Sequence, residues 1–92
     1  YILICEDRKD CLEVRLGNRD KHLSYRGELG HRVSLAGPML SDDGESMVGS
    51  ELIIEAESAN EIQAIADGDP YALAGLFEKV TIRPFRQVIP GA

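Results

Sequence analysis

The sequence has few aromatic residues and few cysteines, and it lacks the spacing that most metal sites need. Its 92 residues include no tryptophan, two cysteines and two histidines, and aromatic residues make up 5% of the chain. Cys5 and Cys11 form no CxxC pair, and no histidines stand at ligand spacing, so we expect no metal site. Cys5 lies in an apolar run that favours a buried free thiol, which is typical of a reducing compartment. We therefore expect a cytoplasmic protein without a disulfide.

Long hydrophobic runs and an excess of basic charge are also missing. No apolar run approaches the roughly 18 residues that a membrane-spanning helix needs, so we expect no membrane association. Sixteen acidic residues against ten basic ones give a formal net charge of −6. This charge argues against nucleic acid as a partner, because binding a phosphate backbone requires a basic face. Arg15, Arg19, Lys21 and Arg26 still cluster locally, which favours a basic rim around a pocket for a small anion.

Length and hydropathy indicate one small domain over residues 1–92. We expect no signal peptide before the first strand, and because the chain begins at Tyr1 without a methionine, we expect further residues upstream. Residues 1–5 form a continuous apolar run, typical of a central strand that is covered on both faces. Helices of the same chain can cover one face, and a second subunit is the simplest cover for the other.

Spacing and capping signals predict the helices. Leu12, Leu16, Leu23 and Gly30 recur at spacings of four and seven and predict a helical stripe. We expect the flank of Leu23 and Gly30 to be more buried than the neighbouring flank of His22, Arg26 and Leu29. A Gly-Asn pair interrupts this region, so we expect a kink or two helices over 11–16 and 19–29.

The second helical region begins and ends on strong local signals. Ser58 and Glu61 have the spacing of a capping box, and Gly68 can adopt the positive φ that closes a helix. Asp69 followed by Pro70 is an N-cap signature for a further short helix.

Three further strands are expected over 33–40, 49–57 and 78–88. Pro38 and Pro84 cannot donate to a ladder, so their strands belong at the edges of the sheet. The proline-free first and third strands would then be central. This order fits a ferredoxin-like split βαβ arrangement, whose strands run 4-1-3-2. The sequence therefore predicts an α+β fold with a four-stranded antiparallel sheet and helices on one face.

With these elements assigned, the chain resembles the YCII-related (YciI-like) family over almost its whole length. The resemblance is carried by Arg15-Leu16, residues 19–23, residues 35–38, Gly49-Ser50, Asp69-Pro70-Tyr71 and residues 80–85.

This resemblance implies a dimeric α+β barrel, in which two ferredoxin-like sheets pack face to face, and hence a homodimer. It also implies an active site on a histidine and an aspartate, which correspond to His22 and Asp69, with Ser50 at a third pocket position. Relatives of the family include a dehydrochlorinase of chlorinated hydroxyquinols, and structurally similar barrels include muconolactone isomerases.

His22 and Asp69 are the main candidates for chemistry. In a split βαβ fold the helices that carry them pack on the same face of the sheet, so the two side chains can meet. A free imidazole has a pKa of about 6.5, which suits proton transfer at neutral pH. A carboxylate on one ring nitrogen fixes the tautomer and supports the imidazolium. Without such a role, His22 is a polar residue on a helix flank and Asp69 an N-cap, although one carboxylate can cap and orient at once.

Three residues are candidates for binding a ligand. Ser50 has no GxSxG turn around it, which favours a polar contact in the pocket over a nucleophile. Arg19 can hold a carboxylate or phenolate, or form a surface ion pair. Tyr71 can form an aromatic wall of the pocket or pack in the core.

Together these residues predict a cofactor-free enzyme that performs acid–base chemistry, of the isomerisation or elimination type, on a small cyclic or aromatic anionic molecule. The alternative is a non-catalytic, dimeric module that binds a small ligand, or acts as an accessory protein, through the same cleft. A third reading is an interaction protein whose only partner is its own copy.

Overall fold

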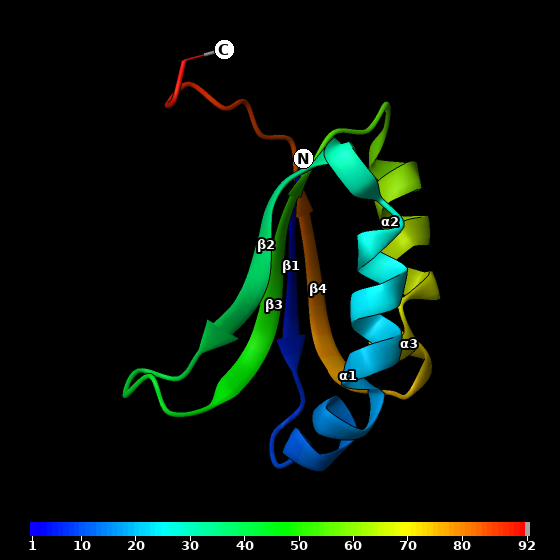
Figure 1. Cartoon of the computed structure of the whole chain (residues 1–92), viewed down its shortest axis with the longest axis vertical. Helices are drawn as coiled ribbons and strands as arrows, with labels where there is room; N and C mark the ends of the chain where they lie inside the picture. The colour runs from blue at the N-terminus through cyan, green and yellow to red at the C-terminus, as the bar shows by residue number, and fades with distance from the viewer. Residues whose placement is uncertain (92) are drawn as a thin grey trace.

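The computed structural model describes residues 1–91 and contains a four-stranded antiparallel sheet with the helices on one face (Figure 1). A short 3-10 turn, η1, precedes the second strand. The elements are β1 (Ile2–Asp7), α1 (Leu12–Gly27), η1 (Gly30–Arg32), β2 (Val33–Leu40), β3 (Met47–Ile54), α2 (Ala59–Gly68), α3 (Pro70–Leu73) and β4 (Phe77–Arg83).

The strand order β2-β3-β1-β4 confirms the predicted split βαβ topology. Strands β1 and β3 are central, and Pro38 lies in the edge strand β2 as expected. The other edge strand, β4, was predicted too long, because it ends at Arg83, directly before Pro84. Strand β3 was also misplaced by a few residues, since it begins at Met47 and ends at Ile54.

The hydrophobic core lies between the sheet and the helices. Leu3 and Cys5 of β1 and Leu52 of β3 are 0% exposed, and they face α2, which contributes Ile62 and Ala66. The alternation of side chains along β3 sends one set into this core and the other to the opposite face. Burying the core side chains supplies the main driving force that holds α2 on the sheet.

Helix α1 runs without interruption from Leu12 to Gly27, so the expected division into two helices is wrong. A side chain at Gly17 would meet nothing within 4 Å, so this glycine is an exposed position with only a propensity cost of about 1 kcal/mol. The Asn18 amide donates to the carbonyl of Val14 at 2.9 Å and so returns to the helix backbone. Arg15 and His22 are buried on either side of Gly17.

The prediction that the Leu23 flank of α1 is more buried than the flank of His22 and Arg26 is wrong. Leu12, Leu16 and Leu23 are 44%, 54% and 49% exposed. The buried side chains of this helix are instead Arg15, His22 and Arg26. A polar helix face can point inward when each group finds a partner there, and carboxylates from other elements provide those partners.

The junction of α2 and α3 follows most of its predicted signals. The Ser58 hydroxyl accepts from the Glu61 amide at 3.2 Å, but the Glu61 carboxylate accepts from the Glu57 amide rather than from that of Ser58. Helix α2 ends at Gly68 without a positive φ. A Cβ at Gly68 would lie 2.7 Å from the Tyr25 hydroxyl, so a side chain there would displace Tyr25.

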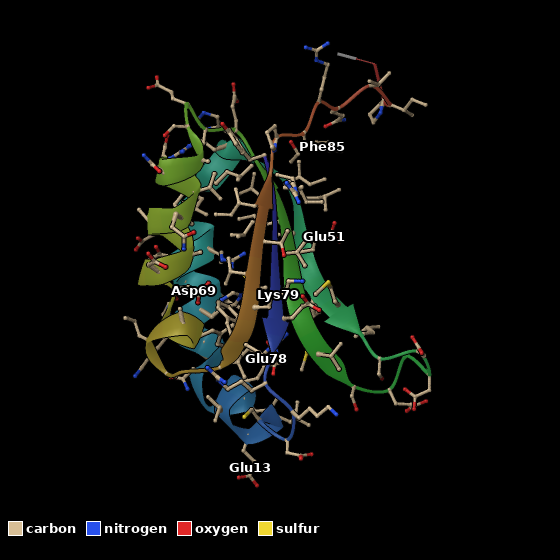
Figure 2. All side chains as sticks on the ribbon, turned by 180° about the vertical axis from the view of Figure 1, so that it is seen from behind. Glu13, Glu51, Asp69, Glu78, Lys79 and Phe85 are labelled. Atoms are coloured by element: carbon tan, nitrogen blue, oxygen red, sulfur yellow. The ribbon has the colours of Figure 1, made fainter. Side chains whose placement is uncertain are left out.

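The other face of the sheet carries no helix. Ile2 and Ile53 pair across β1 and β3, and Leu35 of β2 continues the same row. Ile2 and Ile53 are half-buried, and Leu35 is 54% exposed. Figure 2 shows Glu51 on this side of the sheet and Asp69 on the helix side. No helix within residues 1–91 is long and apolar enough to cross a membrane.

Candidate functional site

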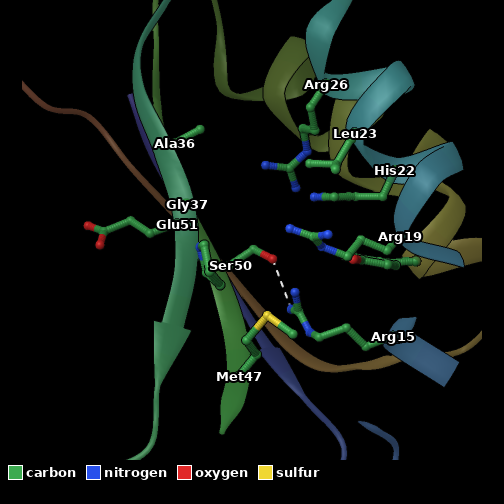
Figure 3. A pocket seen from close by; sticks show the side chains of 12 residues that line it. Arg15, Arg19, His22, Leu23, Arg26, Ala36, Gly37, Met47, Ser50 and Glu51 are labelled. Atoms are coloured by element: carbon green, nitrogen blue, oxygen red, sulfur yellow. Dashed lines mark hydrogen bonds between the residues drawn. The ribbon is translucent and has the colours of Figure 1, made fainter. Parts of the chain in front are cut away.

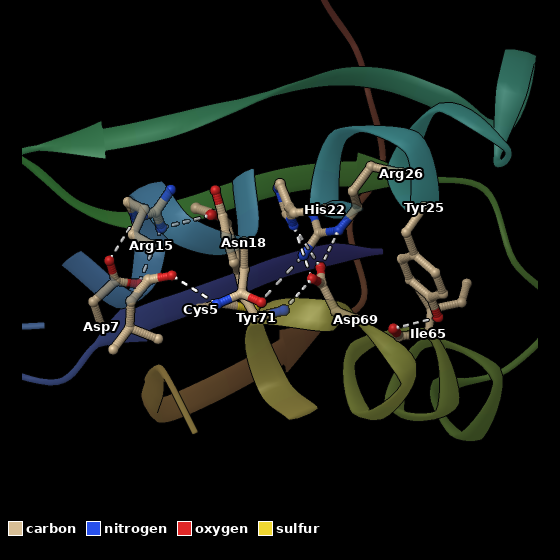
Figure 4. Close-up of polar contacts among 12 residues, drawn as sticks. Cys5, Asp7, Arg15, Asn18, His22, Tyr25, Arg26, Ile65, Asp69 and Tyr71 are labelled. Carbon is tan, nitrogen blue, oxygen red and sulfur yellow. Dashed lines mark hydrogen bonds and ion pairs between the residues drawn. The ribbon is translucent and has the colours of Figure 1, made fainter. Parts of the chain in front are cut away.

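The side chains of His22 and Asp69 meet between α1 and the start of α3 (Figure 4). Nδ1 of His22 lies 2.8 Å from Oδ1 and 2.9 Å from Oδ2 of Asp69. The two residues are 8% and 0% exposed. Local sequence explains the placement of Asp69, because Pro70 occupies the first turn of α3 and leaves the aspartate as its N-cap.

Asp69 is saturated with hydrogen bonds. Its Oδ1 accepts from the backbone amide of Tyr71 at 2.9 Å, and its Oδ2 accepts from Nε of Arg26 at 2.8 Å. Burial alone would raise the pKa of this carboxyl group, but the bonds from His22 and the Tyr71 amide, together with the charge of Arg26, hold the pKa below its usual value. Asp69 is therefore ionised at neutral pH.

The ionised aspartate determines the tautomer of His22. A carboxylate can only accept hydrogen bonds, so Nδ1 of His22 carries a proton. In the neutral imidazole the lone pair is then on Nε2. Within residues 1–91 this nitrogen has no hydrogen-bond partner, and the His22 ring is directed from α1 toward the strands (Figure 3). The arrangement leaves one proton acceptor free beside β3.

Tyr71 is packed between two polar groups. Its ring stacks on that of His22 with centroids 3.9 Å apart and an interplanar angle of 12°. The guanidinium carbon of Arg15 lies 4.7 Å from the same ring centroid, and Figure 4 shows Tyr71 between Arg15 and His22. Burial raises the pKa of the Tyr71 phenol, so it stays protonated at neutral pH. The stack fixes the plane of the imidazole.

Arg15 joins a second carboxylate to the site. Its Nε and Nη2 donate to Asp7 at 2.6 and 3.0 Å, and Nη2 also donates to the Ser50 hydroxyl at 3.0 Å. Burial alone would lower the pKa of Arg15, but the hydrogen bonds and charge of Asp7 raise it above its usual value. The guanidinium is therefore a fixed positive charge that bridges Asp7 of β1 and Ser50 of β3.

These side chains border a cavity of about 110 Å³ between α1 and strands β2 and β3 (Figure 3). A cavity of about 150 Å³ is known to hold one benzene molecule, so this one suits a single small ring that extends to the opening. Its residues are Arg15, Arg19, His22, Leu23, Arg26, Ala36, Gly37, Pro38, Met47, Ser50, Glu51 and Tyr71.

The cavity carries an uncompensated positive charge. Arg15 is paired with Asp7, and Arg26 with Asp69. Arg19 is exposed at the mouth of the cavity and forms no ion pair within the part of the chain that the structure describes. The Glu51 side chain points to the opposite face of the sheet (Figure 3). The site therefore favours an anion, although the whole chain is acidic.

Of the predicted residues, His22, Ser50, Arg19 and Tyr71 line the cavity, and Asp69 lies directly behind His22. Whether they act on a substrate remains a prediction. Sequence reasoning placed Arg15 and Arg26 in a basic rim around an anion pocket but predicted neither their burial nor their carboxylate partners, and it assigned no role to Asp7.

Two observations bear on other chemistry. Cys5 lies beneath the site, with Sγ 4.0 Å from Nη2 of Arg26, and burial raises the pKa of its thiol to about 11. A thiol in that state is a poor nucleophile. Among residues 1–91, no three His, Cys, Asp or Glu side chains are grouped as metal ligands.

Fold and site together define an α+β protein of split βαβ topology, with a buried histidine–aspartate pair at the wall of a cavity that three arginines line. A family model described as the YCII-related domain matches residues 1–86. The chain belongs to this family, as the sequence predicted.

Individual relatives agree with this assignment. Protein YciI of Escherichia coli O6:H1 is 41% identical, and the alignment covers 96% of this chain and 97% of that protein. An uncharacterised protein of Haemophilus influenzae is 32% identical over the same shares of the two chains. Among solved structures, 5-chloro-2-hydroxyhydroquinone dehydrochlorinase (TftG) from Burkholderia phenoliruptrix AC1100, in complex with 2,5-dihydroxybenzoquinone, is similar with a TM-score of 0.87 and 32% identity. That comparison covers 99% of this chain and 97% of the other.

Proposed function

We propose that this protein is a cofactor-free enzyme that transfers protons on a small cyclic or aromatic anion, with His22 as general base and acid and Asp69 as its orienting partner. The observation that carries this proposal is the free Nε2 of an imidazole whose Nδ1 is held at 2.8 Å by an ionised carboxylate. This is the arrangement that a general base needs, because the carboxylate sets the tautomer and stabilises the imidazolium. Ser50, Arg19 and Tyr71 bind the ligand.

Cavity size and charge support the ligand class. The volume of about 110 Å³ suits one ring, and Arg19 supplies a free guanidinium for a phenolate or carboxylate. The similar dehydrochlorinase binds 2,5-dihydroxybenzoquinone. We therefore propose hydroxylated six-membered rings as the ligand class of this protein.

Elimination on such a ring needs no redox partner. In a chlorinated hydroxyquinol, a proton moves from a hydroxyl group to the chlorine-bearing carbon. Loss of a second hydroxyl proton then sends an electron pair through the ring, and chloride leaves with the C–Cl bonding pair. The sum is loss of HCl. Both steps are proton transfers of the kind that an oriented histidine catalyses by roughly 10²–10⁴-fold.

Chloride release tests the proposal directly. We expect the wild-type protein to accelerate release of chloride from 5-chloro-2-hydroxyhydroquinone, measured with a chloride electrode under nitrogen. We also expect 2,5-dihydroxybenzoquinone to shift the amide NMR signals around His22, Ser50 and Tyr71. Binding without turnover would favour the alternative, a ligand-binding or accessory module, and neither binding nor turnover would remove both functions.

We further propose that the protein is a homodimer in which the helix-free faces of two sheets pack together, in the cytoplasm where its two free cysteines stay reduced. The half-buried Ile2 and Ile53 and the 54% exposed Leu35 give this face an apolar row. Apolar area of this kind is typical of a permanent interface.

A charge placed in that row should weaken the dimer. Sedimentation equilibrium is expected to give twice the chain mass of 10.1 kDa for the wild type. Leu35→Lys should raise the dissociation constant at least about tenfold, because it buries an unpaired charge. Leu73→Lys is the matched control, since Leu73 is 76% exposed on the helix side. Equal dissociation constants for the two variants would contradict this interface.

A further inference from the structure

The second carboxylate of the site, Asp7, lies at the end of β1 and has no part in the proton transfer proposed above. Its two oxygens receive Nε and Nη2 of Arg15 at 2.6 and 3.0 Å. The side chains of Asp7 and Arg15 are only 7% and 3% exposed. A buried bidentate pair of this kind fixes the plane of the guanidinium as well as its position.

The fixed guanidinium determines whether the Ser50 hydroxyl donates or accepts hydrogen bonds. Nη2 of Arg15 lies 3.0 Å from the Ser50 hydroxyl oxygen, and a guanidinium has donors only, so the hydroxyl must accept this bond. Within residues 1–91, Ser50 has no other hydrogen-bond partner through its side chain. The hydroxyl proton is therefore free to be donated, and Ser50 is 3% exposed on the wall of the cavity.

Arg15 keeps further donors of its own. Its contacts with Asp7 and Ser50 use Nε and Nη2, which leaves the two hydrogens of Nη1 unassigned. Arg15 lines the same cavity. Ser50 and Arg15 thus form one donor group on the strand side, and the free Nε2 of His22 is the acceptor on the helix side.

We propose that Asp7 is a positioning residue for ligand binding: by fixing Arg15 it turns Ser50 into a hydrogen-bond donor for an oxyanion or carbonyl oxygen of the ligand. The proposal rests on the proposed function for the location of the site. It also narrows the ligand, which must present an acceptor oxygen to Ser50 and Arg15 while a proton of the same molecule faces His22. Hydroxyquinones and ionised hydroxyquinols have this combination.

The competing explanation is that Asp7 and Arg15 only tie β1 to α1. In that case the loss of Asp7 and the loss of the Ser50 hydroxyl would weaken binding independently. If Asp7 acts through Arg15 on Ser50, the two losses are coupled, and a double-mutant cycle separates the two explanations.

The experiment measures the dissociation constant of 2,5-dihydroxybenzoquinone by its visible absorption for four proteins: wild type, Asp7→Asn, Ser50→Ala and the double variant. We expect each single change to weaken binding about tenfold, as for loss of one charge-assisted hydrogen bond. The dissociation constant of the double variant should be at most about threefold higher than that of the single variant with the lower affinity. Glu6→Gln, a change at the exposed neighbour of Asp7 on β1, is the control that should bind as the wild type does.

Each outcome is decisive. Coupled losses support the positioning role, even in a protein that releases no chloride, in which case only the catalytic part of the proposed function fails. Additive losses, about 100-fold in the double variant, or an Asp7→Asn variant that binds normally, would overturn the positioning role and leave the proposed function standing. A wild-type protein that does not bind the quinone overturns both, because the ligand class is then wrong. Asp7→Asn should lower the midpoint of thermal unfolding, because the buried guanidinium of Arg15 loses its carboxylate, so binding is compared at a temperature at which every variant is folded. The Nδ1–H tautomer of His22, read from ¹⁵N shifts, should stay unchanged.

Discussion

Asp69→Ala is expected to lower the free energy of unfolding by about 3–5 kcal/mol, because removing one partner of a buried ion pair leaves the other charge uncompensated. Asp69 is 0% exposed and receives three donors, from His22, Arg26 and the Tyr71 amide. Alanine would leave the Arg26 guanidinium, itself 8% exposed, without its carboxylate. It would also uncap α3. Urea unfolding followed by circular dichroism at neutral pH measures the loss.

The control for this change is Asp67→Ala. Asp67 is an exposed aspartate near the end of α2, and its side chain accepts from the Gln63 amide at 2.9 Å. We expect the control to change the free energy of unfolding by no more than about 0.5 kcal/mol. Similar losses for the two variants would show that the buried network around Asp69 does not stabilise the fold.

Acid should act through the same carboxylate. The folded pKa of Asp69 lies below its usual value, while in the unfolded chain an aspartate has a pKa of about 3.9. The unfolded state therefore binds more protons in the interval between these two values. The contribution of Asp69 is fully present above the unfolded pKa and is lost as the pH falls through the folded pKa. Asp69→Asn should accordingly unfold with a shallower dependence on pH below about 4.

The topology was readable from the sequence because few arrangements satisfy its prolines. Pro38 requires an edge strand, and the apolar run at residues 1–5 requires a central one. Only local exceptions arose. Strand β4 ends before Pro84, which shows that a proline at an edge can end pairing as well as tolerate it.

The inner face of α1 could not be read in the same way. Hydrophobic spacing favoured Leu12, Leu16 and Leu23, whereas Arg15, His22 and Arg26 are the buried residues. These three also recur at helical spacing, but hydrophobicity alone ranks the flank of Leu23 as the more buried one. Which stripe faces inward depends on whether carboxylates are present on the other side. Asp7 and Asp69 supply them from β1 and the start of α3, and local patterning of α1 contains no information about either.

The pairing of His22 with Asp69 was foreseen for two separate reasons. The Asp-Pro signature placed Asp69 at a helix start, and the family resemblance selected His22 from two histidines. The N-cap role of Asp69 does not prevent its contact with His22. Its Oδ1 accepts from both the Tyr71 amide and His22, and its Oδ2 accepts from Arg26. The ion pair between Arg26 and Asp69 was not predicted. A third partner for one carboxylate follows from packing and not from sequence spacing.

His22→Gln is expected to reduce the catalysed rate of proton transfer by roughly 10²–10⁴-fold while changing ligand affinity only a few-fold. Glutamine is close to histidine in size, and its amide can donate to Asp69, so the buried carboxylate keeps a partner. It cannot take up or release a proton at neutral pH. Single-turnover measurements in the chloride-release assay separate the rate constant of the chemical step from binding. A loss confined to that rate constant identifies a group that acts in the transition state.

The chain contains a matched control for this variant in its only other histidine. His31 is exposed in the 3-10 turn before β2 and lies outside the cavity, so His31→Gln should react at the wild-type rate. If His22→Gln retained the wild-type rate, or lost activity only through weaker binding, the imidazole would not be the base. The site would then be a binding pocket in which Asp69 and His22 hold the wall in place. A large loss in His22→Gln beside an unchanged His31→Gln would assign the proton transfer to Nε2 of His22, whose other ring nitrogen is held by Asp69.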